Sequence, residues 1–196
     1  MECAPPCWQQ IRPGVSTGEE VLARLHQIPW VDKESINDLR VNEYPINSQI
    51  MFSFTPQVGD VGGRIYFFDH SRVATIDLDT GYSLIVADAI RQLGEPQHIS
   101  AASAMADGEY FVAALIYESK GVVVHIYKDL LRRYDNQEGL TELRPDDPIA
   151  SVVYFDPGSY DEIRRMGRLS NYPNPYLDVA LQCWKGFGVI KYERQP

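Results

Sequence analysis

The acidic string Asp77-Leu-Asp-Thr-Gly is the segment that comes closest to a metal-binding motif. A calcium-binding EF-hand loop carries acidic ligands at positions 1, 3 and 5, glycine at position 6 and an acidic residue at position 12. Counted from the first aspartate, Asp77, Asp79 and Asp88 occupy positions 1, 3 and 12. Gly81 falls at position 5, one position before the glycine of the motif. This misplacement favours a turn followed by a helix N-cap. We therefore predict no metal site and no cofactor, and these three aspartates are weak metal candidates only.

Three cysteines, Cys3, Cys7 and Cys183, decide the expected redox chemistry. Cys3 and Cys7 flank Ala-Pro-Pro, a CxxxC spacing that differs from the CxxC of zinc and redox sites. Because the prolines restrict this segment to turn-like shapes, we predict a small disulfide ring, which indicates an oxidising compartment. Two alternatives remain: both thiols are free, or Cys183 pairs with one of them. With the ring closed, Cys183 is predicted to be a buried free thiol in an aromatic strand.

The histidines and paired carboxylates show no contiguous catalytic motif. No two of the four histidines have the HxH, HxxxH or HExxH spacing of metal sites, and no GxSxG nucleophile motif occurs. Adjacent carboxylates such as Asp146 and Asp147 are typical of helix starts and loops. The sequence leans away from an enzyme, and a hydrolase whose site is assembled from dispersed carboxylates is the alternative.

Aromatic side chains are concentrated late in the chain, which has 12 tyrosines and 3 tryptophans. Such side chains supply large, rigid contact area with a polar tip, as binding surfaces require. We name as candidate binding residues Tyr172, Tyr176, Trp184 and Phe187. A protein partner is expected for them, with a glycan or another small molecule as the alternative. Because β-sheets favour aromatic residues, a purely structural role explains the same pattern.

Charge and hydropathy narrow the class of partner. The 196-residue chain has 18 basic and 27 acidic residues, which gives a net charge of −9. A nucleic-acid-binding protein needs a basic surface to neutralise phosphates, so we expect no nucleic acid partner. No apolar run approaches the roughly 18 residues that span a bilayer. The sequence therefore predicts no membrane-spanning helix.

Hydrophobic periodicity predicts a helix and then strands in the first part of the chain. Residues 19–27 have apolar side chains at helical spacing, Thr17 or Ser16 can form a capping box, and Pro29 ends the helix. Strict alternation predicts a strand over residues 46–55. A glycine-rich turn then leads to strands at residues 65–68 and 73–78.

The same order is predicted to recur in the second part. A helix over residues 85–93 ends at Gly94, and a hairpin follows with strands over residues 110–118 and 122–127. Further strands are predicted at residues 149–155 and 179–192. Four residues recur 67 positions later: Gly14, Ser16, Arg24 and Pro29 match Gly81, Ser83, Arg91 and Pro96. We therefore predict an α+β fold of two tandem repeats, residues 1–80 and 81–196, each a short helix followed by antiparallel strands, with the helices packed on the sheet.

Two groups of residues resemble known families. The opening Cys3-Ala-Pro-Pro-Cys7-Trp and the later Trp184-Lys-Gly-Phe-Gly188 are similar to strings in a group of uncharacterised bacterial exported proteins, many of them lipoproteins. The second group is Gly81, Ser83 and Leu93-Gly-Glu-Pro96. It distantly resembles the small lipoproteins of outer-membrane assembly (SmpA/OmlA) and the tandem-repeat β-lactamase-inhibitor-like fold. These resemblances imply a binding or scaffold module without catalytic residues.

These features together predict an exported, non-catalytic module that binds a protein or packs in an envelope or surface assembly. The expected location is extracytoplasmic, either secreted or anchored at the cell surface. The lipoprotein resemblance implies a membrane tether through a lipid anchor in a segment preceding Met1.

Overall fold

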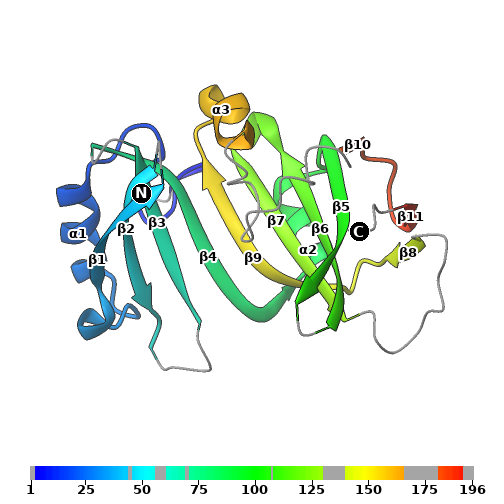
Figure 1. Ribbon diagram of the computed structural model, residues 1–196, viewed down its shortest axis with the longest axis horizontal. Helices are drawn as coiled ribbons and strands as arrows, with labels where there is room; N and C mark the ends of the chain where they lie inside the picture. Colours follow the sequence, from blue (N-terminus) through cyan, green and yellow to red (C-terminus); the bar gives the residue numbers. More distant parts are fainter. Residues whose placement is uncertain are drawn as a thin grey trace.

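One antiparallel sheet forms the centre of the protein (Figure 1). The computed structural model describes residues 3–43, 46–55, 61–68, 71–106, 108–129, 140–165 and 181–191. Within these residues the sheet has nine strands in the order β1-β2-β3-β4-β9-β7-β6-β5-β10. Their bounds are β1 Asn37–Glu43, β2 Ile46–Ser53, β3 Gly62–Phe68, β4 Arg72–Ile85, β5 His98–Ala106, β6 Gly108–Tyr117, β7 Val122–Asp129, β9 Pro148–Phe155 and β10 Gln182–Cys183. A second, two-stranded sheet pairs β8 (Leu140–Leu143) with β11 (Gly188–Lys191).

The prediction of two tandem helix-and-strand repeats is wrong. β4 pairs with β9 and β9 pairs with β7, so one sheet runs without a break from β1 to β10. The predicted boundary between residues 80 and 81 falls inside β4. The residues that recur are largely turn and helix-end positions, where backbone geometry selects glycine and proline in any fold. Their recurrence therefore reports two similarly bounded helices and not two separate units.

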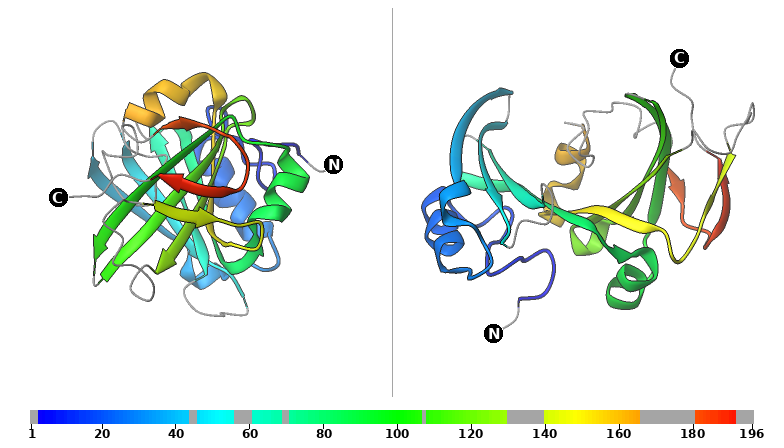
Figure 2. Two further views of the ribbon diagram at one scale, coloured as in Figure 1. Left: turned by 90° about the vertical axis from the view of Figure 1, so that its right-hand side faces the viewer. Right: turned by 90° about the horizontal axis from the view of Figure 1, so that it is seen from below.

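The sheet has two unlike faces. Figure 2 (right) shows that it curves, with α3 (Tyr160–Arg165) on the inner side and α1 (Gly18–Gln27) and α2 (Val86–Leu93) on the outer side. On the outer face α1 packs over β2, β3 and β4, while α2 and the β8–β11 sheet pack over β5, β6, β7 and β9. On the inner face α3 covers the middle of the sheet. We call these the outer face and the inner face below.

The two outer helices begin and end close to their predicted bounds. At the start of α1 the Thr17 hydroxyl accepts from the Glu20 amide at 3.4 Å, and the Glu20 carboxylate accepts from the Thr17 amide at 2.9 Å. This reciprocal pair is the predicted capping box. Val21 and Leu25 are fully buried beneath the helix. α2 ends at Gly94, whose φ of +77° suits a residue without a side chain.

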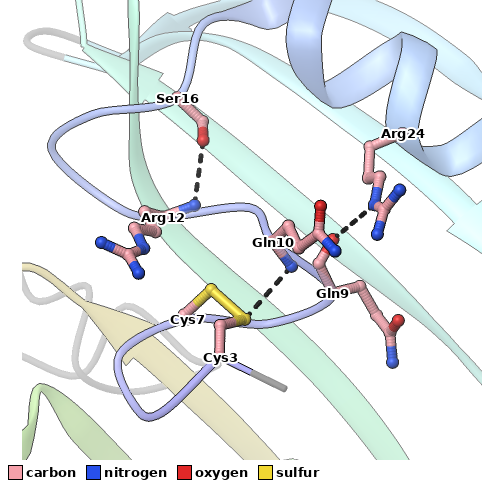
Figure 3. Close-up of a disulfide and its surroundings, with 7 residues drawn as sticks. All are labelled: Cys3, Cys7, Gln9, Gln10, Arg12, Ser16 and Arg24. Atoms are coloured by element: carbon pink, nitrogen blue, oxygen red, sulfur yellow. Dashed lines mark hydrogen bonds between the residues drawn. A yellow bond between two sulfur atoms is a disulfide. The ribbon is translucent and has the colours of Figure 1, made fainter. Parts of the chain in front are cut away.

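The N-terminal segment lies on the outer face and is closed by the Cys3–Cys7 disulfide (Figure 3). The Gln10 amide donates to Cys3 Sγ at 3.2 Å, and Arg24 Nε of α1 donates to the Gln9 carbonyl at 2.8 Å. Trp8, which follows Cys7, stacks on the aromatic ring of Phe52 of β2, and the two ring centroids are 5.5 Å apart. The segment closed by the disulfide therefore contacts both α1 and the sheet.

The same ring also contacts the turn between β6 and β7. A Cβ added to Gly121 would lie 2.9 Å from Pro6 Cβ and 2.1 Å from the Phe155 carbonyl oxygen. Only glycine fits there, and its φ of +62° is one that side chains rarely adopt. The N-terminal segment thus links the two halves of the sheet across the outer face.

Candidate functional site

On the inner face, the cluster beneath α3 includes side chains of β4, β6, β7 and β9, and Tyr66 and Phe68 of β3 pack against its edge. Among the described residues, no side chain of β1 or β2 belongs to this cluster, so the inner face over β1, β2 and the adjoining part of β3 and β4 is less covered. We call this region the open patch and define it by Leu39, Gln49, Met51, Arg64, Tyr66 and Asp79. Leu39 is 36% exposed, Arg64 is exposed, and the other four side chains are half-buried.

Strand register places these side chains side by side. Leu39, Gln49 and Tyr66 lie in one row across three strands, because Leu39 pairs with Gln49 and Gln49 with Tyr66. Met51 and Arg64 lie in the next row, where Arg64 pairs with Asp77 of β4. Side chains at directly opposed positions are within contact reach. The patch is thus continuous from the edge strand to the centre of the sheet.

Arg64 is held in place by its neighbours. Its guanidinium interacts with the Tyr66 hydroxyl and with nearby carboxylates. Partial burial would lower the pKa of Arg64, but Tyr66 and then the carboxylates of Asp77 and Asp79 raise it above its ordinary value. Burial is the main cause that raises the pKa of Tyr66, which stays a neutral donor and acceptor. The guanidinium is therefore permanently charged and restrained.

Asp77 and Asp79 point to the same face of β4 but differ in their surroundings. Asp77 is 7% exposed and lies opposite Arg64. Asp79 is half-buried and forms no hydrogen bond or ion pair with any described residue. Burial raises the pKa of Asp79, and the more distant charge of Arg64 opposes the shift only in part. Asp79 is thus a half-buried carboxylate to which no described residue donates a hydrogen bond.

Beyond Asp79 a row of polar side chains continues across the inner face. Asp79 pairs with Ser151 of β9, and Ser151 pairs with His125 of β7. The Ser151 hydroxyl lies 3.0 Å from His125 Nδ1, and both residues are at most 1% exposed. In a hydrolytic triad the histidine stands between the acid and the serine. Here serine stands between aspartate and histidine, so this row does not have the triad arrangement.

The weak metal candidates are separated. Asp88 lies at the start of α2, where its carboxylate accepts from the Ile85 amide at 3.4 Å and pairs with Arg91 at 3.0 Å. Asp77 and Asp79 lie on β4 beside the cation Arg64. Among the described residues no group of three or more His, Cys, Asp or Glu side chains is arranged to hold a metal ion. The segment from Asp77 is part of a long bulged strand and not a loop.

The predicted aromatic candidates are brought together in part. Trp184 and Phe187 make an edge-to-face contact with centroids 5.6 Å apart. Trp184 packs against the outer-face core, while Phe187 remains 42% exposed. Tyr172 and Tyr176 lie outside the described residues. The pair lies on the far side of the sheet from the open patch.

Cys183 is free, as expected, but the prediction that it is buried is wrong. It lies on the two-residue strand β10, opposite His98 of β5. A strand this short at the edge of the sheet cannot enclose the thiol, which is why the residue is exposed.

Sequence reasoning did not single out the open patch. The sequence does contain a signal for it, because residues two positions apart on a strand lie on the same face of a sheet. Such pairs are Gln49 and Met51 on β2, Arg64 and Tyr66 on β3, and Asp77 and Asp79 on β4. No helix of the described residues is both long and apolar enough to cross a membrane. Comparisons with family models, curated proteins and solved structures found no match to this chain.

Proposed function

We propose that this protein is an exported, non-catalytic module that binds a protein partner through the open patch. The observation that carries the proposal is the unequal covering of the inner face. α3 closes this face over the middle of the sheet, whereas the adjoining strands present large side chains to solvent. A sheet face of that kind is a typical protein contact surface.

The composition of the open patch supports this role. Arginine, tyrosine and methionine are enriched at protein interfaces, and arginine and tyrosine dominate among the residues that contribute most to binding. Arg64 is already oriented by Tyr66, so little side-chain entropy is lost when a partner contacts it. The patch combines charged, polar and apolar groups, as the surface of a protein that also exists unbound requires.

The disulfide supports an extracytoplasmic location. Disulfides persist in oxidising compartments and are rare in the cytosol. Cys3 and Cys7 form a disulfide, and Cys7 is only 6% exposed. Alkylating free thiols in intact cells of origin before lysis tests this part of the proposal. Modification of Cys183 alone is expected, and modification of all three cysteines would contradict it.

Photo-crosslinking from two adjacent positions of β1 tests the contact surface. Leu39 faces the inner side of the sheet and its neighbour Asp38 faces the outer side, because they pair with Gln49 and Ile50 respectively. A photo-reactive residue is introduced at position 39 or 38 and the cells are irradiated. We expect an adduct from position 39 and none from position 38. Equal adducts from both positions, or none from position 39, would overturn the proposal.

A further inference from the structure

Asp79 differs from the other shielded carboxylates of the described residues. Most of these accept hydrogen bonds or pair with a base: Asp32 with the Glu34 amide, Asp88 with Arg91, Glu118 with His98, Asp147 with Lys128 and Asp156 with the Gly158 amide. Asp77 lies directly opposite Arg64. Asp79 alone has neither kind of partner among the described residues. A partly buried carboxylate without donors is unfavourable, and a donor from outside the chain would relieve that cost.

The neighbours of Asp79 leave access to its carboxylate. On the β9 side the facing residue is Ser151. On the β3 side the pairing with β4 ends at Gly63 and Leu78, and the next residues along the two strands are Gly62 and Asp79. A Cβ at Gly62 would lie 2.2 Å from the Phe52 carbonyl oxygen, so this position is confined to glycine. Among the described residues, Ser151 on β9 and Gly62 at the start of β3 therefore place no large side chain next to Asp79.

The local charge favours a cation over an anion. Arg64 lies opposite Asp77 and acts on Asp79 only through its charge, so two carboxylates lie near one guanidinium. The whole chain carries a net charge of −9, which attracts a basic partner at long range. A second carboxylate beside Asp79 would be repelled, whereas an ammonium or guanidinium group would complete a balanced set of two acids and two bases.

We infer that Asp79 receives the ammonium or guanidinium group of a lysine or arginine side chain of the protein partner. This inference rests on the proposed function and adds the chemistry of the contact. The charged group of the partner donates to the Asp79 carboxylate, and the apolar stem of the same side chain lies along the open patch. A charge-assisted hydrogen bond that is sheltered from water is stronger than one between neutral groups, so its loss should weaken binding at least about tenfold.

A peptide selection on the intact protein tests the inference without knowledge of the natural partner. Cyclic peptides displayed on phage are selected on the wild-type protein, and each is then measured against three variants. Leu39→Lys disrupts the open patch, Asp79→Asn removes the carboxylate at constant shape, and Asp38→Asn is the matched control on the opposite face. Thermal unfolding of each variant verifies that it is folded.

The expected result is a set of peptides that depend on Leu39 and contain a required lysine or arginine. Their affinity should fall at least about tenfold with Asp79→Asn and stay unchanged with Asp38→Asn. Peptides that depend on Leu39 but not on Asp79 would overturn the inference and leave the proposed function standing. If no selected peptide depends on Leu39, the proposed function fails and the inference fails with it.

Discussion

The inner face of the sheet is built differently over its two halves. Over β6, β7 and β9 the inner positions include Ala114, Val123 and Val153, each at most 1% exposed beneath α3. Over β2 and β3 the inner positions include Met51 and Arg64, which are half-buried and exposed. The backbone hydrogen bonding is antiparallel in both halves, so strand geometry does not cause the difference.

Side-chain volume and charge account for the unequal covering. Small apolar residues let α3 approach the sheet closely enough to bury Ile163 completely. A helix laid over Arg64 would have to shield a guanidinium from water, and such burial is costly unless the charge is fully paired. The open half is therefore kept accessible by its own residues. What covers it must bring complementary polar groups, as a binding partner can.

The largest expected effect is a difference in stability between two alanine variants, one from each half of the inner face. Ile163→Ala should lower the free energy of unfolding by about 3 kcal/mol, because it leaves a cavity in a fully buried site. Leu39→Ala should cost less than about 1 kcal/mol, since Leu39 is 36% exposed. Urea denaturation of both variants measures the contrast. Similar losses at the two positions would mean that the open half is as closely packed as the closed one.

Loss of the N-terminal ring should destabilise the outer face and leave the open patch intact. Replacing Cys3 and Cys7 by serine removes a constraint across four residues of sequence and should cost about 2 kcal/mol in unfolding free energy. Unfolding followed by tryptophan fluorescence includes the signal of Trp8. Peptides selected on the open patch should bind this variant as tightly as wild type. Weakened binding would show that the two faces are coupled.

Asp79→Asn should stabilise the unbound protein by about 1 kcal/mol at pH 7. Burial raises the folded-state pKa of Asp79, so the charged form is penalised in the folded state. The penalty is full at pH values above the folded-state pKa and disappears below the unfolded value of about 3.9. The gain in unfolding free energy should therefore shrink as the pH falls from 7 to about 3.5. A variant less stable than wild type at pH 7 would indicate an internal partner for Asp79.

The smallest expected effect is at Tyr117. Its hydroxyl lies in the core, where a partner cannot reach it, whereas the Asp79 carboxylate lies on the open patch. The Tyr117 hydroxyl is buried in the outer-face core, finds no partner among the described residues, and burial raises its pKa to about 12. Tyr117→Phe should raise the unfolding free energy by about 0.5 kcal/mol. Peptide binding to the open patch should not change. Thermal unfolding and the same binding assay check both expectations.

Local patterns predicted individual elements well. The capping residues Thr17 and Glu20 and the stop at Pro29 gave α1, and Gly94 gave the end of α2, because these residues satisfy backbone groups within a few positions. Strands with alternating apolar residues, such as β2, were also recognisable. The strands β1 and β5 were not predicted, since one is rich in polar residues and the other in alanine and serine, which have little β-propensity.

The joining of the sheet and the open patch could not be read from the sequence. Both depend on the insertion of β9 between β4 and β7, which pairs β4 with residues far along the chain, such as Thr75 with Phe155. Only that pairing places Asp79 beside Ser151. That no described residue donates to Asp79 could likewise not be predicted from the sequence, where Asp77 has the same residue type and nearly the same spacing from Arg64.

The most direct test of the open patch uses the partner protein that is captured by photo-crosslinking from position 39. The affinity of this partner is measured for two arginine variants of the present protein. Arg64 belongs to the patch, whereas Arg144 lies at the far end of the molecule beside Glu142, with which it pairs at 2.5 Å. We predict that Arg64→Ala weakens binding at least about thirtyfold, which corresponds to about 2 kcal/mol, while Arg144→Ala leaves it unchanged. An Arg64→Ala variant that binds within about twofold of wild type would contradict the assignment of the open patch as the binding surface.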